Sequence, residues 1–279
     1  MVLTAVSHDS RRDDAELPES RLGKIQFTYN ENMSLVMGSK QITLYITQTC
    51  PWAARARIAL REVNVPFTEH DIDLRNKPQW YLSDVNPAGL VPAIAYGGPN
   101  VPPDQPSSES IKLRESLLIV EWVADEFPKS NLLPESPLNR YRARLIIDVV
   151  ATKLVTALNA LVFRDGTSED LIKSIELVQK ELVPSAKYAL SDQFTIADAA
   201  SAPFISRVIL FLKNDLGVST EPGQSKGLYD LITQDAKFSR FWSYAQAILE
   251  RPSVKDVINE VRVPIRYDSL WLIIKSRNC

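Results

Sequence analysis

Residues 41–60 read QITLYITQTCPWAARARIAL, and this stretch decides the fold of the chain. From Ile42 to Ile46 apolar residues alternate with others, the period of two that is typical of a β-strand. After Pro51 the apolar side chains recur at a helical spacing instead. Proline suits the first turn of a helix, because the N–H group that it lacks would have no partner there. The stretch therefore predicts a strand, a short polar turn and a helix that begins directly after Cys50. Three arginines are expected on other faces of that helix: Arg55, Arg57 and Arg61.

Cys50 is the first candidate catalytic residue. As the N-cap of this helix, its sulfur would face backbone N–H groups that have no partner within the helix, and these donors favour an anion. A free thiol has a pKa of about 8.5, and a helix N-terminus lowers that pKa by about one to several units. Most lone cysteines are structural and buried, which is the alternative here. The Cys-Pro junction at a strand-to-helix turn favours a reactive thiolate.

No second cysteine lies near Cys50, because the local sequence is Cys50-Pro51-Trp52-Ala53 rather than C-x-x-C. A mixed disulfide at Cys50 would therefore have to be released by an external thiol. Cys279 is at the end of the chain, and we expect it to have no role in catalysis.

Composition narrows the classes of function. The chain has 279 residues, which is enough for two domains, and a net charge of −2, which indicates no nucleic-acid partner. Two cysteines make no disulfide framework, and the N-terminus lacks a long apolar segment, so we expect a cytoplasmic protein without a signal peptide. No apolar run is expected to reach the length of a membrane span. With only His8 and His70, a histidine-based triad or metal site is not expected.

The order of predicted elements suggests two domains. Residues 1–39 are predicted to form an N-terminal arm with a short strand at 24–29, and residues 40–127 a mixed sheet with helices in the order βαβαββα, the outline of a thioredoxin-like domain. A proline-rich linker at 128–137 would lead to an all-α domain at 138–279, and the fold class is therefore α+β. After the opening stretch, strands of the first domain are expected at 66–73, 93–96 and 111–113. A helical segment is expected at 78–85 and a helix from 115 to 127. Residues 97–110 are expected to be a surface loop rich in Pro and Ser.

In the second half, a helix is predicted over 140–161 and another over 169–190. Thr195 and Asp198 have the spacing of a capping box, which predicts a helix start. A loop is expected at 217–227, followed by helices at 238–249, 253–261 and 268–275.

Four segments, TCPWAARARIAL, LRNKPQWY, NPAGLVPAI and RESLLIVEWVADEFP, carry a family resemblance over about residues 40 to 130. In this order they resemble the cytosolic glutathione transferases, and among these the omega class with its active-site cysteine. The loop at 97–110 is similar to that of fungal members. The resemblance implies glutathione as co-substrate, no metal, and a homodimer built on the helices that begin at Glu115 and Arg140.

The resemblance also implies a glutathione site around Cys50, which would form the mixed disulfide. Val91 would pair through its main chain with the cysteinyl part of glutathione, like an added strand, and this requires a cis bond before Pro92. Ser116 would bind the γ-glutamyl carboxylate, and Glu115 the γ-glutamyl ammonium.

Lys77 would reach the glycyl carboxylate, and Trp52 would form a wall beside the sulfur. Each residue has a purely structural alternative: core packing for Val91 and Trp52, helix capping for Glu115 and Ser116, and solvation for Lys77. The occurrence of all of them in family order favours the binding site.

The acceptor substrate is expected to be a small hydrophobic or aromatic molecule. By resemblance, Arg207, Tyr267 and Trp271 would face the open side of the cleft, whereas packing of Trp271 and pairing of Arg207 with an acid are the alternatives.

Together these features predict a glutathione-dependent thiol transferase. Such an enzyme would remove glutathione from mixed disulfides or glutathionyl conjugates (deglutathionylation) and would serve in detoxification. The main alternative is a non-catalytic carrier of aromatic small molecules. A second alternative is the chloride-channel-like branch of the fold, which inserts into membranes, and the absence of a long apolar N-terminal run argues against it.

Overall fold

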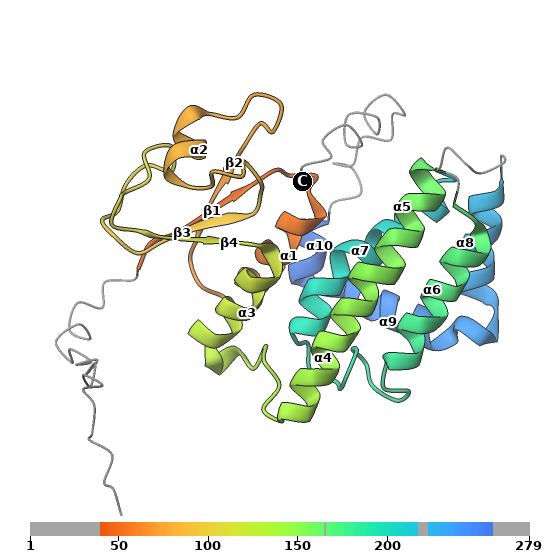
Figure 1. The fold of residues 1–279 in the computed structure, drawn as a ribbon. Helices are drawn as coiled ribbons and strands as arrows, with labels where there is room; N and C mark the ends of the chain where they lie inside the picture. The colour runs from red at the N-terminus through yellow and green to blue at the C-terminus, as the bar shows by residue number, and fades with distance from the viewer. Residues whose placement is uncertain (1–39, 165, 217–222, 259–279) are drawn as a thin grey trace, which may run out of the picture. The chain divides into compact units, whose positions relative to one another are not determined.

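The computed structural model describes residues 40–164, 166–216 and 223–258 (Figure 1). The predicted N-terminal arm, its strand at 24–29 and the helix at 268–275 lie outside the described residues. The predicted domain boundaries therefore remain predictions, and the fold is described for the remainder of the chain.

The opening stretch forms the predicted elements. Strand β1 (Ile42–Ile46) is buried along its whole length, and α1 (Pro51–Glu62) begins with Pro51 in its first turn and Cys50 at the N-cap. Strand β2 (Thr68–Asp71) returns parallel to β1, with Thr43 opposite Thr68. The strand is shorter than the predicted 66–73, but its position is as expected.

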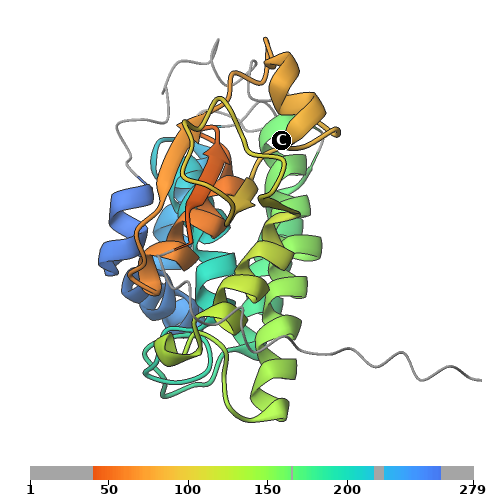
Figure 2. The same ribbon diagram turned by 90° about the vertical axis from the view of Figure 1, so that its left-hand side faces the viewer.

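The rest of the sheet is antiparallel. After the short helix α2 (Gln79–Asp84), strands β3 (Ala93–Tyr96) and β4 (Ile111–Arg114) form a hairpin, and β3 pairs antiparallel with β1. The strand order is β2-β1-β3-β4, and α3 (Ser116–Glu126) follows directly (Figure 2). This mixed sheet and the order βαβαββα confirm the thioredoxin-like prediction. Helix α1 packs against both α3 and the later helix α7, so the core continues from the sheet into the helices.

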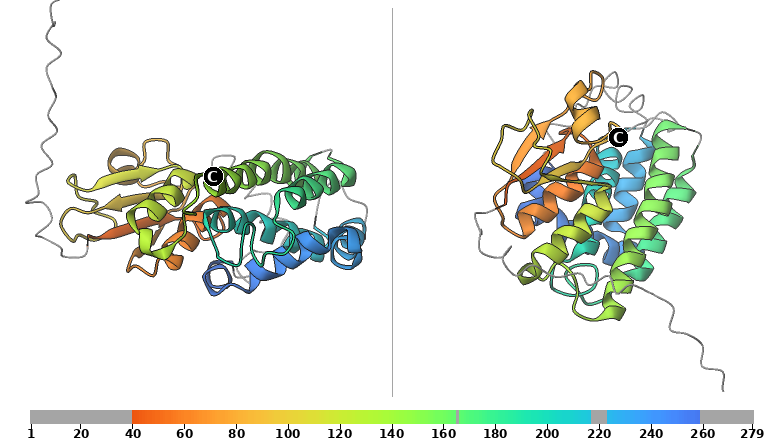
Figure 3. Two further views of the ribbon diagram at one scale, coloured as in Figure 1. Left: turned by 90° about the horizontal axis from the view of Figure 1, so that it is seen from below. Right: turned by 60° about the vertical axis from the view of Figure 1, so that its left-hand side comes forward.

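A long helix opens the second half. The proline-rich stretch contains a 3₁₀ turn, η2 (Pro128–Ser130), and is followed by α4 (Pro137–Val149), a π-helical turn η3 (Val150–Leu154) and α5 (Val155–Phe163), which run on without a break (Figure 3). Within the described part of the chain, Pro137–Phe163 is a helix long and apolar enough to cross a membrane by length and composition alone. This corrects the expectation that no segment reaches that length. Helices in the core of soluble proteins pass the same test, and this one places Ile146, Val150 and Leu154 in the core.

Two predictions in the second half are wrong. Helix α6 (Ser168–Glu181) ends well before residue 190, because Leu182 is extended and Pro184 disfavours helical geometry at Val183. Helix α8 (Gln224–Gln234) occupies part of the predicted loop and the stretch after it, and it begins after Gly223, whose φ of 86° is left-handed. Gly223 and Gly227 made this segment resemble a loop.

The starts of the remaining helices agree with the sequence. Helix α7 (Ile196–Lys213) is buried over most of its length and starts with the predicted capping box, in which the Asp198 carboxylate accepts from Thr195 N at 2.8 Å. A 3₁₀ turn η4 (Ala236–Phe238) leads into α9 (Ser239–Glu250), and α10 (Pro252–Val257) follows. Helix α10 ends earlier than the predicted 261, because Ile258 follows Val257 with a non-helical backbone, φ −102° and ψ 76°; residues 259–261 lie outside the described part.

Candidate active site

Cys50 lies where β1 and its turn lead into α1. Its backbone is extended, with φ −78° and ψ 120°, its N–H donates to Thr47 O at 2.9 Å, and its own carbonyl accepts the first bond of the helix from Ala54 N at 3.0 Å. The side chain is 3% exposed. Its sulfur lies 3.9 Å from the main-chain oxygen of Val91. The predicted N-cap position is confirmed, and the fold brings the predicted nucleophile next to the predicted glutathione-binding backbone.

The bond between Val91 and Pro92 is cis, as predicted. Leu90, the residue before Val91, is held by two side chains. Its carbonyl accepts from Tyr81 Oη at 2.5 Å and from Asn86 Nδ2 at 2.8 Å. Burial raises the pKa of Tyr81 well above its usual value, so its hydroxyl stays a donor at neutral pH. The main chain that leads into Val91 is therefore fixed by two side chains.

Tyr81 and Asn86 were missed by the sequence reasoning. The signal for Asn86 was present in the Asn-Pro pair, since Asn side chains commonly bond to the backbone two residues on, and here Asn86 Oδ1 accepts from Ala88 N at 3.2 Å. Tyr81 carries no such local signal, because its bond to Leu90 depends on how α2 packs.

Lys77 lies against the same loop. A Cβ built on Gly89 would be 2.9 Å from Lys77 Cδ and 3.1 Å from Lys77 Nζ, so the side chain of Lys77 crosses the space that the glycine leaves open. Gly89 has a φ of 63°, a conformation that side-chain-bearing residues rarely adopt. The ammonium of Lys77 therefore lies beside Gly89, which is two residues before Val91 in the sequence.

Glu115 and Ser116 form the start of α3. Glu115 is the N-cap with a left-handed φ of 68°, and it is exposed, whereas Ser116 is the first residue of the helix and 9% exposed. The Ser116 hydroxyl oxygen accepts from Arg55 Nη1 at 3.4 Å. A left-handed residue other than glycine is uncommon and is often found at functional sites.

Trp52 on α1 and Arg207 on α7 lie where these two helices meet. The Trp52 ring is half-buried and meets the ring of Phe204 at 4.7 Å in a T-shaped pair. Arg207 Nη2 donates to the main-chain oxygen of Thr49, the residue before Cys50. Of the three predicted acceptor residues, Arg207 is thus near the catalytic turn, and Tyr267 and Trp271 lie outside the described residues.

The arginines of α1 are more buried than a helix face pattern suggests. Arg55 is 3% exposed and Arg57 is 4% exposed. Arg57 makes a bidentate pair with Glu69 on β2, at 2.9 and 2.8 Å, and Arg61 bridges Glu69 and Asp256. Sequence reasoning missed Arg55 as a residue of the site, because the acceptors of its bonds lie far away in the chain.

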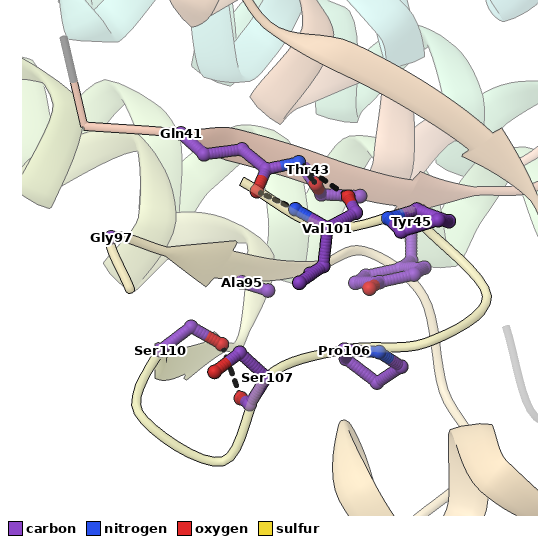
Figure 4. A pocket seen from close by; sticks show the side chains of 10 residues that line it. Gln41, Thr43, Tyr45, Ala95, Gly97, Val101, Pro106, Ser107 and Ser110 are labelled. Carbon is purple, nitrogen blue, oxygen red and sulfur yellow. Dashed lines mark hydrogen bonds between the residues drawn. The ribbon is translucent and has the colours of Figure 1, made fainter. Parts of the chain in front are cut away.

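A small cavity lies between the sheet and the loop at 97–110, lined by Gln41, Thr43, Tyr45, Ser107 and Ser110 among others (Figure 4). Its volume of about 10 Å³ holds one water molecule at most. Tyr45, one of the lining residues, donates from its Oη to Pro103 O at 2.8 Å. This cavity contains none of the predicted site residues and is too small for a substrate.

The described ranges contain no group of three or more His, Cys, Asp or Glu side chains placed to hold a metal ion. The candidate site has one thiol at a helix N-terminus beside the main chain of Val91, a lysine against the loop before Val91, and a serine at the start of α3. This set can bind an extended, doubly anionic peptide and perform thiol chemistry on it.

Comparisons with known proteins agree with this geometry. Residues 44–131 match the family model described as Glutathione S-transferase, N-terminal domain. Glutathione transferase Omega 1C from Trametes versicolor is 42% identical, covers 86% of this chain and 97% of its own, and superposes with a TM-score of 0.76. Omega 2C from the same fungus is 43% identical, with 84% and 99% covered and a TM-score of 0.78.

A third similar structure is that of Omega 2S from Trametes versicolor in complex with 2,4-dihydroxybenzophenone. It is 36% identical, covers 85% of this chain and 99% of its own, and has a TM-score of 0.74.

Proposed function

Since the chain belongs to the omega-class glutathione transferases, we propose that it is a thiol transferase that removes glutathione from mixed disulfides or glutathionyl conjugates through Cys50. One observation carries the proposal: the Cys50 sulfur lies at the N-terminus of α1 and 3.9 Å from the carbonyl oxygen of Val91. A cysteine suits thiol–disulfide exchange, whereas a serine or tyrosine hydroxyl would instead stabilise the thiolate of glutathione for conjugation.

The proposed reaction has two exchange steps. The Cys50 thiolate attacks the glutathionyl sulfur of a mixed disulfide, a Cys50–glutathione disulfide forms, and the acceptor leaves as a thiolate that takes a proton from solvent. The thiolate of a second glutathione then attacks the glutathionyl sulfur bound to Cys50. Oxidised glutathione leaves and the Cys50 thiolate returns, so the acceptor sulfur is reduced and the second glutathione is oxidised, while the first glutathionyl unit stays at the disulfide level.

The binding roles follow from charge and geometry. The main chain at Val91 would pair with the cysteinyl part of glutathione, which places the glutathione sulfur near Cys50. Ser116 and the N-terminus of α3 would take the γ-glutamyl carboxylate, and the exposed Glu115 its ammonium. Lys77 would bind the glycyl carboxylate and Trp52 would border the sulfur.

Mass spectrometry after incubation with oxidised glutathione tests the proposal directly. We expect one added glutathionyl group, on the peptide that contains Cys50, and its removal by reduced glutathione. Cys279→Ser is the matched control, and it should still gain the group. Modification of Cys279 alone would contradict the assignment.

A second candidate function is the carriage of aromatic molecules, which the 2,4-dihydroxybenzophenone complex of Omega 2S favours. Both functions can occur in one protein. Titration with 2,4-dihydroxybenzophenone, followed by quenching of tryptophan fluorescence, separates them: micromolar binding together with no measurable disulfide reduction would favour the carrier.

The oligomeric state is also a proposal. Three large apolar side chains are exposed on α3 and α4: Leu118 is 64% exposed, Leu138 57% and Tyr141 60%. Large apolar groups gathered on neighbouring helices are typical of interfaces between protein chains. We therefore propose a homodimer through these two helices.

A further inference from the structure

Arg55 on α1 joins three helices by contacts of a single buried guanidinium. Its Nε donates to the main-chain oxygen of Ala200 on α7 at 2.8 Å, and its Nη1 donates to Ser116 Oγ on α3 at 3.4 Å. The guanidinium carbon also lies over two rings, 4.8 Å from the centroid of Trp52 and 4.7 Å from that of Phe204. Arg55 is therefore held by contacts with α3, α7 and two aromatic rings. One of these contacts, the bond to Ser116, reaches a residue of the predicted glutathione site.

The charge of Arg55 has no acidic partner among the described residues. Its side chain is 3% exposed, and its Nη2 is buried without a hydrogen-bond partner in the described part of the chain. Burial lowers the pKa of Arg55 to about 10, so it remains a cation at neutral pH. An unpaired buried cation is costly to the folded state. By contrast Arg57, two residues later, is neutralised by Glu69.

The bond to Ser116 determines what the serine can do. A guanidinium has donors and no acceptor, so the Ser116 oxygen must accept from Arg55, and the proton of the serine hydroxyl is left for another acceptor. Ser116 donates to no other group in the described ranges. A hydroxyl that accepts from a cation is polarised and becomes a stronger donor, which suits a carboxylate acceptor.

We propose that Arg55 is a positioning residue for glutathione: it orients and polarises the Ser116 hydroxyl toward the γ-glutamyl carboxylate. The inference rests on the proposed function, in which Ser116 binds that carboxylate. The anchor on Ala200 and the two aromatic rings keep the guanidinium in place, so α7 contributes to glutathione binding through Arg55 without touching the ligand.

A double-mutant cycle on glutathione binding, measured by calorimetry, tests the coupling. We expect Arg55→Lys and Ser116→Ala each to raise the Kd for glutathione about tenfold, the effect of one lost hydrogen bond. The double variant should be no weaker than the weaker single variant, because Arg55 acts through Ser116. Independent effects, which multiply to about a hundredfold, would overturn the inference.

Arg57→Lys is the matched control. It changes a buried arginine on the same helix that pairs with Glu69 and does not reach Ser116. We expect its Kd for glutathione to stay within about twofold of the wild type. An equal loss in Arg57→Lys and Arg55→Lys would mean that any buried arginine of α1 supports the site only by stabilising the fold, and would overturn the inference.

If Arg55→Lys folds poorly, its affinities for two ligands are compared, and the first ligand is glutathione itself. The second ligand is glutathione with its γ-glutamyl carboxylate converted to an amide. A folding defect lowers the active fraction for both ligands, whereas a lost positioning contact lowers the preference for the carboxylate. A preference unchanged from the wild type would overturn the inference.

The two proposals fail in different ways. If Ser116→Ala leaves the Kd unchanged, the proposed glutathione site is wrong and the inference falls with it. If Ser116→Ala weakens binding and Arg55→Lys does not, the site stands and only the role of Arg55 is overturned.

Discussion

The sulfur of Cys50 lies 3.9 Å from the main-chain oxygen of Val91, across 41 residues of sequence. A strand-to-helix turn carries the first, and a loop that enters β3 carries the second. This contact brings a candidate nucleophile to a backbone segment that is suited to bind the cysteinyl part of a peptide. The first predictions test each side of it.

Cys50→Ser is expected to abolish the reduction of mixed disulfides and to leave glutathione binding within about twofold of the wild type. A serine hydroxyl is not an anion at neutral pH without a base, and His70, on β2, is not placed beside it in the described contacts. Calorimetry with glutathione and a mixed-disulfide assay on the same preparation measure both effects. Retained reductase activity would remove Cys50 from the mechanism.

Alkylation of Cys50 by iodoacetamide should continue at a pH at which free cysteine no longer reacts. We expect the N–H groups of the first turn of α1 to favour the thiolate, although the burial of the side chain and the Val91 carbonyl oxygen 3.9 Å from the sulfur oppose it. The rate is measured against pH, with Cys50→Ser as the control for reaction at Cys279. A midpoint equal to that of free cysteine would show that the helix N-terminus does not activate the thiol.

Gly89→Ala should weaken glutathione binding, because the added Cβ would lie 2.9 Å from Lys77 Cδ and displace that side chain. The left-handed φ of 63° adds about 1 to 2 kcal/mol of strain. Gly97→Ala is the control: its φ of 74° imposes the same strain, and nothing lies within 4 Å of its new Cβ. We expect both variants to lose stability in urea, and only Gly89→Ala to bind glutathione more weakly. Equal binding by both would show that Lys77 is not needed.

The stability of the protein should depend on pH through Asp198, a fully buried carboxyl. Burial raises its pKa to about 6, against the hydrogen bonds from Thr195 N and Ala189 N that favour the carboxylate. With a folded pKa above the unfolded value of 3.8, its contribution is complete below pH 3.8 and is lost as the pH rises through 6. The loss is about 3 kcal/mol.

Asp198→Asn removes this titration and keeps a side chain that can cap the helix. The free energy of unfolding of the wild type minus that of the variant should therefore fall between pH 4 and pH 7 in urea titrations. A difference that rises with pH would show that the two backbone donors outweigh burial.

The proposed dimer predicts sedimentation at twice the 31.4 kDa of one chain. Leu118→Glu should shift the equilibrium to the monomer, because it would bury a carboxylate in an apolar interface. Leu177→Glu, which changes an exposed leucine on α6, is the control and should remain dimeric. A wild type that sediments only as a monomer at micromolar concentration would contradict the interface on α3 and α4.

Local signals were enough for the framework of the site. The alternation before Cys50, the proline after it and the capping box at Thr195 each depend on residues within a few positions, and the structure confirms all three. The cis bond at Val91-Pro92 was implied by the family resemblance and is confirmed as well. These features are set by the backbone preferences of proline, of short polar caps and of alternating strands.

Other features could not be read in this way. The early end of α6 and the start of α8 were mispredicted. Pro and Gly can end a helix, start one or be tolerated inside one, so their presence alone does not fix where a helix begins or ends. The bond from Tyr81 to the carbonyl of Leu90 follows from how α2 packs against its loop.

The sequence by itself determined that a cysteine caps a helix after a strand, and in what order the elements follow. Only the tertiary structure decided that Arg55 is buried, since its partners Ser116 and Ala200 are 61 and 145 residues away. The physical reason is that a helical pattern assigns a residue to a face, whereas burial of a charge depends on which distant donors, acceptors and rings surround that face.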